Sequence, residues 1–580
     1  MEKRLLKPRN LIRLALTVAV FVAVGAFTLI PVAAQSELPV PRNETIFMED
    51  TAVYTVFDSF NTRIPQGDEY ANGYQQVGVE NLFLANFATG KIEPWLATGY
   101  TYNSDYTELT IKLRSDVHWQ DGVAFSSDDV VYTINTIMST PALSGNTTLN
   151  QYIDSVSNPD ATTVVIKLKT AAPRFVYTFF GQTGSWEVWP KHIWEKQDPT
   201  TFKNNPPVTT SVWKLKEVNT DLKMFIWERD DNYWDKAERF PEAKYVIYRQ
   251  APSSADADYQ DFVSNNIDHG HALQWQQIQQ AQQANAKVTY GQFDDPCPRG
   301  IWLNDQKYPL SLPEMHWVIS DLVDRDKIAN VIWQPPTTPA DHPWSDWALL
   351  KPFIDPAVIQ QYPLTFDTDK ANAILDQLGF TQRNGDNIRL DDKGNPLSFT
   401  IITPAAVGQG EYQIAQDVAD EAQNVGIQLT VKHEDGAVFD NDRDTGNFDI
   451  TSHWLCFTAL DALDLYGQFT SDQPIPTNGE RTSCDCNWIG FKDPTFDQAV
   501  ATIKANGPDT DAAKAAYTTA LTEWMKNLPG IPVVQTIYVM PWNTTYWTGW
   551  PTDSNMFTVP FTWWATFIKV PFELKSTGAS

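Results

Sequence analysis

The chain has 580 residues, with 71 Asp or Glu against 43 Lys or Arg, so its formal net charge at pH 7 is -28. This length is too great for one hydrophobic core and predicts about three to five domain-sized units. The acidic balance argues against binding to nucleic-acid phosphates, and a single long apolar run argues against a polytopic membrane protein. The 22 Trp and 21 Tyr are numerous for an acidic chain, and we expect some of them to line a ligand groove.

The N-terminal residues predict an export signal. Basic residues within positions 3–13 precede an uncharged apolar run at 14–30 and a stretch of small residues that ends at Ala34. This order is typical of a secretion signal, so we expect residues 1–34 to be a signal peptide cleaved after Ala34. An uncleaved membrane anchor is the alternative, because the run is near the lower limit for spanning a bilayer. The first cysteine is Cys297, so we expect a periplasmic or cell-surface protein without a lipid anchor.

Short strand patterns alternate with helical patterns along the rest of the chain, which predicts a mixed α/β fold. Alternation with period two indicates strands, and amphipathic spacing with capping residues indicates helices. We expect Gly379 and Gly426 to end two of the helices. The predicted strands are 108–113 and 398–403, and the predicted helices are 126–138, 370–378, 412–424 and 511–526.

Motifs for catalysis or metal binding are absent from the sequence. It contains no phosphate loop, dinucleotide fingerprint, zinc-protease helix or nucleophile elbow. His269 and His271 could share one strand face, but a single pair of histidines is not a metal site. Cys484 and Cys486 are too close for an easy mutual disulfide and lack a second pair of cysteines for zinc. We therefore expect no metal, no cofactor and no enzymatic activity.

Four consecutive blocks from residue 94 onward resemble the hallmark of the family 5 solute-binding proteins. These are the large extracytoplasmic receptors of ABC importers for oligopeptides, dipeptides, nickel and some oligosaccharides. The four blocks are PWLA at 94–97, LTIKLR at 109–114, VHWQDG at 117–122 and SSDDVVY at 126–132. Further blocks follow in the family's order at 189–194, 228–234, 303–304, 309–310, 324–325, 366–367, 370–371 and 447–449.

The hallmark segment itself is expected to be scaffold. Asp121 and Gly122 would form a turn after a strand, since glycine accepts a positive φ without steric cost. Arg114 would pair with Asp128 or Asp129 and so hold that turn to the following helix. The segment therefore identifies a fold and says little about the ligand.

The resemblance implies a two-lobed periplasmic-binding-protein fold of the α/β class, type II-like and of the large cluster C form. An additional domain would accompany the lobes, and the ligand would be enclosed as the lobes close. Two strands crossing near Cys297 and Val533 would form the hinge. Lobe I would comprise 43–85, 208–296 and 533–580, the additional domain 86–207, and lobe II 297–532.

The resemblance also implies a disulfide between Cys297 and Cys456. Cys297 lies seven residues before Asn304, and Cys456 lies seven residues after Asp449. Both spacings are similar to those of the bonded pair in enterobacterial oligopeptide-binding proteins. The alternative is two buried free thiols.

The same alignment bears on the class of ligand. Peptide binders of the family place an Asp two residues after the second cysteine, where it pairs with the peptide's α-ammonium group, and here that position is Thr458. A neutral hydroxyl does not replace a buried charge, although Asp461 or Asp464 is a possible substitute. The family's glycine-rich segment is also altered, to TTSVW at 209–213.

The C-terminal third is similar to the family branch that binds cellobiose and other β-glycosides. The similarity is carried by CNWIGF at 486–491 and by WTGWPT at 547–552 with Asn555. Sugars offer an apolar face for Trp and a ring of hydroxyls for polar side chains. Each Trp suits the core as well as a ligand, so the group is a stronger prediction than any member. The predicted ligand-binding residues are Trp213, Trp302, Asn304, Trp454, Thr458, Asp461, Asn487 and Trp488.

The leading hypothesis is a monomeric binding protein that delivers an oligosaccharide to the permease and ATPase of an ABC importer. The second hypothesis is an oligopeptide-binding subunit of a peptide importer. A secreted carbohydrate-active hydrolase is a distant third, favoured only by the acidity and the number of Trp residues.

Overall fold

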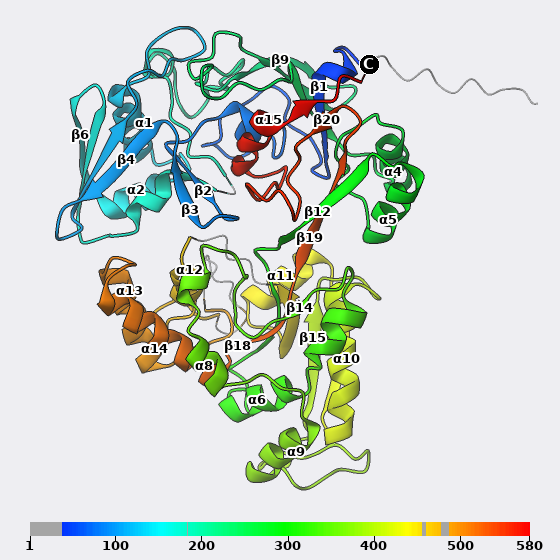
Figure 1. Ribbon diagram of the computed structural model, residues 1–580. Helices are drawn as coiled ribbons and strands as arrows, with labels where there is room; N and C mark the ends of the chain where they lie inside the picture. The colour runs from blue at the N-terminus through cyan, green and yellow to red at the C-terminus, as the bar shows by residue number, and fades with distance from the viewer. Residues whose placement is uncertain (1–37, 183, 455–459, 477–478, 480–486, 580) are drawn as a thin grey trace, which may run out of the picture. The chain divides into compact units, whose positions relative to one another are not determined.

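The structure is a computed structural model that describes residues 38–182, 184–454, 460–476, 479 and 487–579. The predicted signal peptide, residues 1–34, lies outside the described residues. Residues 42–580 form one compact unit, to which everything below refers (Figure 1). Among the described residues, no helix is long and apolar enough to cross a membrane.

The six elements predicted from periodicity are confirmed, with ends that differ by two residues at most. The helix at 410–425 ends at Gly426, whose φ of 86° is the left-handed conformation that favours glycine. The helix at 127–139 begins where the Ser126 hydroxyl accepts a hydrogen bond from the Asp128 amide. The observed elements are β5 (Glu108–Leu113), β15 (Ser398–Thr403), α1 (Ser127–Ser139), α9 (Thr368–Gln377), α10 (Gly410–Val425) and α14 (Asp511–Asn527).

The predicted partner of Arg114 is wrong. Arg114 pairs with Asp116, two residues further along, through Nε–Oδ1 and Nη2–Oδ2 contacts of 3.0 and 2.8 Å. Asp129 is buried and accepts hydrogen bonds from the amides of Ser126 and Lys191 instead. The turn at Asp121 and Gly122 is present, with a Gly122 φ of 87°. The Asp129 carboxylate therefore accepts backbone hydrogen bonds and does not pair with Arg114, because the buried amides at the helix end need acceptors.

Lobe I is built on a four-stranded sheet in the order β1-β11-β10-β9, in which β1 and β11 are parallel and the other pairs are antiparallel. Helices α4 and α5 pack against each other, and α5 contacts β12. The elements are β1 (Thr45–Asp50), β9 (Trp213–Asn219), β10 (Met224–Arg229), β11 (Tyr245–Gln250), α4 (Ala255–Val263), α5 (Trp275–Ala284), β12 (Val288–Asp294), β19 (Ile537–Asn543), β20 (Trp547–Thr548), α15 (Val570–Glu573) and β21 (Lys575–Ser576).

The region of the predicted additional domain contains an antiparallel sheet in the order β4-β5-β7-β6, against which α1 packs. A smaller sheet has the order β3-β2-β8. The remaining elements here are β2 (Phe83–Asn86), β3 (Lys91–Pro94), β4 (Ala97–Tyr102), α2 (Asn146–Tyr152), β6 (Ile153–Asp160), β7 (Thr163–Leu168), β8 (Phe180–Gly181) and α3 (Lys191–Trp194).

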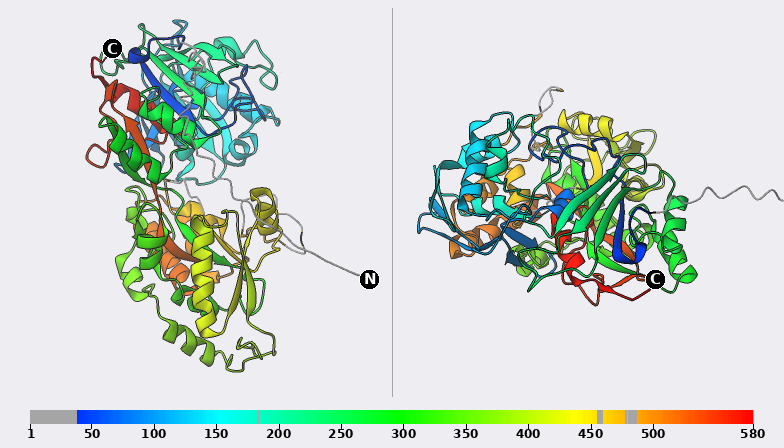
Figure 2. Two further views of the ribbon diagram at one scale, coloured as in Figure 1. Left: turned by 90° about the vertical axis from the view of Figure 1, so that its right-hand side faces the viewer. Right: turned by 90° about the horizontal axis from the view of Figure 1, so that it is seen from above.

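Lobe II is built on a six-stranded sheet in the order β14-β18-β13-β17-β15-β16. Helix α10 lies along β15, β16 and β17, as Figure 2 also shows. The other elements are β13 (Arg299–Leu303), α6 (Pro313–Asp321), α7 (Arg325–Lys327), β14 (Thr338–Pro339), α8 (Pro356–Gln361), β16 (Gln428–His433), α11 (Gly436–Asp444), β17 (Ile450–Trp454), α12 (Leu463–Gln468), α13 (Pro494–Ala505) and β18 (Gly530–Gln535). Short 3₁₀ and π turns occupy Arg42–Glu44, Tyr74–Gly78, Phe175–Phe179, Ile328–Ile332, Lys351–Phe353 and Ala565–Lys569.

The buried apolar side chains form two separate cores. The second core runs from Ile301 to Val534 and belongs to lobe II. The first core combines lobe I with the region of the additional domain, so those two share one apolar interior. Trp347 and Leu460 come from the lobe II part of the chain but pack in the first core. One core thus lies in lobe II, and the other lies in lobe I together with the additional-domain region. The boundaries of the three predicted domains remain a prediction.

His269 and His271 have structural partners. His269 is buried against Trp542, with ring centroids 5.1 Å apart, and burial lowers its pKa to about 3. His271 Nδ1 lies 3.0 Å from a carboxylate oxygen of Asp50. The described residues contain no group of three or more His, Cys, Asp or Glu side chains that could hold a metal ion.

Candidate ligand-binding site

The chain passes between the two lobes at two points that lie side by side. Strands β12 and β19 form an antiparallel pair in lobe I, and they continue into β13 and β18 of lobe II (Figure 1). The intervening segments are 295–298 and Thr536, which we call the crossing. The Asp295 amide donates to the Thr536 carbonyl at 2.9 Å, and the Thr536 hydroxyl donates to an Asp295 carboxylate oxygen at 3.0 Å. The two connections are therefore tied to each other.

Arg299 is the cation at the crossing. Its Nη1 donates to an Asp295 carboxylate oxygen at 3.1 Å, to the Thr536 hydroxyl at 3.2 Å and to the Cys297 carbonyl. Its Nε lies 2.7 Å from a carboxylate oxygen of Glu411 at the start of α10. Burial raises the pKa of Asp295, and the Arg299 charge opposes that shift. The arginine thus joins lobe II to the carboxylate that fixes the crossing.

Trp454 lies beside Arg299 at the same sheet edge. The two residues are register partners on β17 and β13, so their side chains share one face of the sheet. Trp454 is 40% exposed, and its ring centroid lies 4.4 Å from that of His453. This edge holds the carboxyl ends of the parallel strands β15, β16 and β17. Ligands of open α/β sheets bind at such an edge.

Lobe I contributes a row of aromatic rings next to the crossing. Tyr538 follows Thr536 by two residues and is 37% exposed. Its ring centroid lies 5.4 Å from that of Trp563, which stacks on His271 at 4.5 Å with an angle of 8° between the planes. Trp563 is partly exposed. An exposed row of rings at a lobe boundary is a surface on which an apolar ligand face can stack.

The electrostatics link the rings of lobe I to the charges of lobe II. Burial raises the pKa of Tyr538 to about 12, and the charges of Asp295, Arg299 and Glu411 also act on it. Burial together with the positive charge of Arg299 lowers the pKa of His453 to about 3. The Tyr538 hydroxyl is therefore neutral and His453 is uncharged at neutral pH. We call Arg299, Glu411, Trp454, Tyr538 and Trp563 the hinge-edge cluster.

The hinge-edge cluster combines the two kinds of group that a polar ring-shaped ligand requires. Trp454, Tyr538 and Trp563 offer aromatic faces, while Arg299 and Glu411, which are paired with each other, offer their remaining polar atoms as donor and acceptor. These groups can bind and orient such a ligand.

Two of the predicted Trp residues lie in the core of lobe II. Trp302 is 5% exposed and stacks on Phe469, with ring centroids 5.6 Å apart. Trp488 is 6% exposed and lies 5.5 Å from Trp302 and from Phe448. Both rings are thus surrounded by other side chains of the protein. Their role in ligand binding remains a prediction, and Trp454 is the predicted ring with substantial exposure.

The two predicted Asn residues hold the backbone. The side-chain amide of Asn304 donates to the carbonyls of Gly446 and Phe448 at 3.1 and 2.9 Å. Asn487 donates to the Phe491 carbonyl at 2.7 Å, and its own side-chain oxygen accepts from the Gly490 and Phe491 amides. These bonds occupy polar groups that a sugar would otherwise use. Buried loop backbone needs such partners.

Trp213 and Asp461 are also buried. Trp213 begins β9 inside the first core and has no exposed surface. Asp461 is 3% exposed and forms an ion pair with Arg174 of the additional-domain region. The hydroxyl of Tyr517 donates to the same carboxylate and accepts from Arg174 Nη2 at 2.8 Å. We call these three residues the Arg174 network. Its arginine already neutralises the carboxylate that was the candidate partner for a peptide ammonium group.

Part of the predicted site lies outside the described residues. Thr458 is among them, as are Cys456, Cys484 and Cys486. Cys297 is disulfide-bonded. Its pairing with Cys456 remains a prediction.

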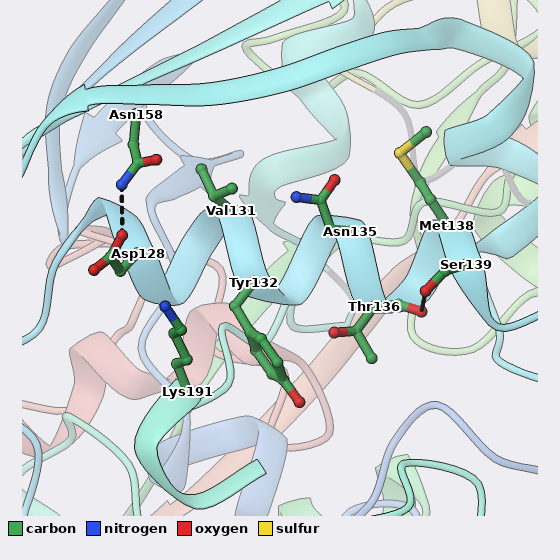
Figure 3. Close-up of a pocket in the computed structure, with 9 residues that line it drawn as sticks. All are labelled: Asp128, Val131, Tyr132, Asn135, Thr136, Met138, Ser139, Asn158 and Lys191. Atoms are coloured by element: carbon green, nitrogen blue, oxygen red, sulfur yellow. Dashed lines mark hydrogen bonds between the residues drawn. The ribbon is translucent and has the colours of Figure 1, made fainter. Parts of the chain in front are cut away.

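A broad groove along α1 has none of these features. It measures about 690 Å³ and is lined by one face of the helix together with Asn158 and Lys191 (Figure 3). Asn158 donates to the Asp128 carboxylate at 2.6 Å, and the Ser139 hydroxyl donates to the Thr136 carbonyl at 3.2 Å; the figure draws both hydrogen bonds. Tyr132 is the aromatic side chain among the residues drawn. Its lining comes from α1, β6 and α3 within the additional-domain region, so movement of the lobes relative to each other would not enclose a ligand there.

Sequence reasoning missed most of the hinge-edge cluster. Arg299 follows Cys297 by two residues, and Tyr538 follows Thr536 by two, so their closeness to the predicted hinge was an available signal. Glu411 and Trp563 had no such signal, because the folded chain alone brings them to the crossing. The same is true of Arg174, whose partner Asp461 is 287 residues away.

Comparison with known proteins gives a consistent picture. The chain matches the model of the bacterial extracellular solute-binding proteins, family 5 Middle, over residues 91–476. It is 24% identical over 380 residues to a probable ABC transporter-binding protein of Deinococcus radiodurans, which covers 60% of this chain and 62% of that protein. It is 22% identical over 460 residues to the nickel-binding periplasmic protein of Escherichia coli, which covers 77% of this chain and 81% of that one.

Solved structures match over nearly the whole chain. A periplasmic oligopeptide-binding protein of Thermotoga maritima has a TM-score of 0.77 at 22% identity, covering 93% of this chain and 100% of that one. Its mannohexaose-bound structure has a TM-score of 0.69 with the same coverage. At this identity the likeness shows the fold. The predicted two-lobed α/β fold is confirmed.

Proposed function

Because this chain belongs to family 5 of the bacterial extracellular solute-binding proteins, we propose that it is the substrate-binding subunit of an ABC importer and that it captures an oligosaccharide. Proteins of this family are extracytoplasmic receptors, so the ligand would be handed to a membrane permease driven by an ATPase. Closure of the lobes would hold the ligand between them, since contacts with both lobes favour the closed state.

The observation that carries the choice of ligand is the pairing of exposed aromatic rings with charged hydrogen-bonding groups in the hinge-edge cluster. A pyranose ring presents C–H faces to aromatic side chains and hydroxyls to groups such as Arg299 and Glu411. The neutral state of Tyr538 keeps its hydroxyl available as a donor. The Thermotoga relative in fold, whose solved structure contains mannohexaose, supports the proposal.

A peptide is the competing ligand, because the Thermotoga structure named above and a sequence relative in Bacillus subtilis, AppA, both carry oligopeptide-binding names. Two features weigh against it. Asp461 is engaged by Arg174 and Tyr517, and the position that would carry the ammonium partner is Thr458. A bound α-ammonium group without an anion would be costly once buried.

Calorimetry on the wild type with cello-, xylo- and manno-oligosaccharides and with a tripeptide mixture tests the proposal. We expect saturable binding of at least one sugar series without products, and thermal stabilisation by that sugar. Tight binding of tripeptides with no binding of any sugar would overturn the oligosaccharide assignment. Released products would point to a hydrolase.

The variant Trp454→Ala probes the hinge-edge cluster directly. Loss of one stacking ring should weaken sugar binding by about 5- to 10-fold, or roughly 1 kcal/mol, with little effect on folding because the ring is already 40% exposed. Phe366→Ala is the matched control, since Phe366 is a 43% exposed ring of lobe II outside the cluster. Equal losses in the two variants would remove Trp454 from the site.

A further inference from the structure

A second cavity lies apart from the hinge-edge cluster, between the additional-domain region and lobe II. It measures about 570 Å³. Tyr100 of β4 and Tyr177 line one side, and Tyr517 of α14 and Leu460 line the other. Asp509 and Lys514 add an acceptor and a donor. The size is in the range of small-molecule sites, and the walls combine aromatic rings with a few polar groups.

The hydroxyls of Tyr100 and Tyr177 are available for a ligand. In the part of the chain that the structure describes, neither hydroxyl has a hydrogen-bond partner. Burial raises the pKa of both, and the charge of Asp509 contributes to each shift, so both hydroxyls are neutral donors near that carboxylate. Tyr100 is 37% exposed, which shows that its ring is open to an incoming molecule.

The cavity shares a wall with the Arg174 network. Tyr517 lines the cavity and donates its hydroxyl to Asp461. Leu460 lines the cavity and immediately precedes Asp461 in the chain. Arg174 binds that carboxylate from the additional-domain side and also donates to the carbonyls of Ile503 and Asn506 at 2.6 and 2.8 Å. An occupant that touches both walls would therefore favour the arrangement in which the network is formed.

Building on the proposed function, we propose that this cavity is a second saccharide subsite, filled by one or two sugar units. Tyrosine rings on opposite walls would contact the C–H faces of a pyranose, and the free hydroxyls with Asp509 and Lys514 would bind its hydroxyls. The sugar can arrive as the far end of a long oligosaccharide held at the hinge-edge cluster or as a separate short one. In both cases its binding stabilises the Arg174 network.

Calorimetry with cellobiose, cellohexaose, mannobiose and mannohexaose separates the two sources. A hexasaccharide that spans both subsites binds one per protein and more tightly than the disaccharide. A separate occupant gives two disaccharides per protein. Tyr100→Ala and Tyr177→Phe should lower hexasaccharide affinity by about 10-fold in the first case and reduce the number of bound disaccharides from two to one in the second.

The control is Tyr132→Ala, which removes a tyrosine from the groove along α1 in the same region of the chain (Figure 3). It should leave affinity and stoichiometry unchanged. Wild-type affinity and stoichiometry in both cavity variants would overturn the subsite while leaving the proposed function intact, provided that Trp454→Ala still weakens binding. If no sugar binds the wild type, both proposals fail. Tyr177→Phe keeps the ring, so its effect isolates the hydroxyl from any loss of packing.

Discussion

Two buried ion pairs join the two cores of this molecule, and they differ in what holds their partners near each other. At the crossing, Arg299 and Asp295 have side chains 13% and 4% exposed. In the Arg174 network, Arg174 and Asp461 are 11% and 3% exposed. The first pair is four residues apart in the chain, whereas the second is 287 residues apart.

This difference decides what each pair can do. Asp295 and Arg299 are joined by a short stretch of backbone, so their ion pair stays together in any arrangement of the lobes. No short stretch of backbone links Arg174 to Asp461, because they are 287 residues apart in the chain. Separation of lobe II from the additional-domain region would therefore return both charges to water and remove the cost of burying them. The same chemistry therefore serves as a fixed joint in one place and as a contact that can break in the other.

Removing the cation at the crossing should have the largest effect. Arg299→Ala leaves the Asp295 carboxylate buried without its charge partner, and the short covalent segment prevents it from moving into water. We expect the free energy of unfolding to fall by about 3–5 kcal/mol, measured by urea denaturation. Arg114→Ala is the control, because its pair with Asp116 is exposed and should be worth less than about 1 kcal/mol. A loss below 1 kcal/mol for Arg299→Ala would mean that the crossing is not a fixed joint.

Protonation of His453 at acidic pH should lower the free energy of unfolding. Its pKa in the folded protein is about 3, below its ordinary value of 6.5, because burial and the nearby Arg299 disfavour the charged ring. The unfolded chain then binds the proton more tightly, so the stabilising contribution is complete above pH 6.5 and is lost as pH falls toward 3. At pH 4 the loss is roughly 3 kcal/mol.

His453→Gln should therefore lose less stability than the wild type between pH 7 and pH 4, as measured by thermal denaturation at each pH. His118→Gln, which changes an exposed histidine, should follow the wild-type curve. Parallel pH curves for His453→Gln and the wild type would show that the ring protonates without cost.

The smallest of these effects concerns closure. Arg174→Ala should lower sugar affinity by about 10-fold, roughly 1.4 kcal/mol, since the closed state then buries an unpaired Asp461. The free energy of unfolding should change less than for Arg299→Ala, because opening relieves the penalty. Calorimetry and urea denaturation on the same samples measure both. Lys203→Ala, which breaks an exposed pair with Asp58, is the control. A loss of folding stability as large as that of Arg299→Ala would make the network a permanent part of the fold.

Much of the architecture could be predicted from the sequence. The predicted ends of six helices and strands agree with the structure to within two residues. The two-lobed fold was predicted from the ordered family blocks. Local signals suffice where the cause is local, such as the Ser126 cap of α1 or the left-handed Gly426 that ends α10. The arrangement of these elements into two lobes was predicted from the order of the family blocks, because members of a family share one chain topology.

The predicted site residues stay a prediction, and the sequence could not show which of them are buried, because residue type does not reveal burial. Trp302 and Trp454 are the same residue type on neighbouring strands of one sheet, yet the first packs on Phe469 in the core and the second is 40% exposed. The side-chain amide of Asn487 suits a sugar hydroxyl, but in the fold it donates to the backbone carbonyl of Phe491. In each case the deciding contacts come from residues distant along the chain.

The sequence by itself therefore determined the elements, the family and the approximate place where the chain crosses between lobes. Only the tertiary structure decided which polar and aromatic groups remain available at that place. Arg299 and Tyr538 lie near enough to interact electrostatically because the paired strands β12 and β19 continue into the paired strands β13 and β18. Arg174 contacts Asp461, which is 287 residues away in the chain. Such long-range contacts depend on how whole elements pack, and no local pattern of residues encodes them.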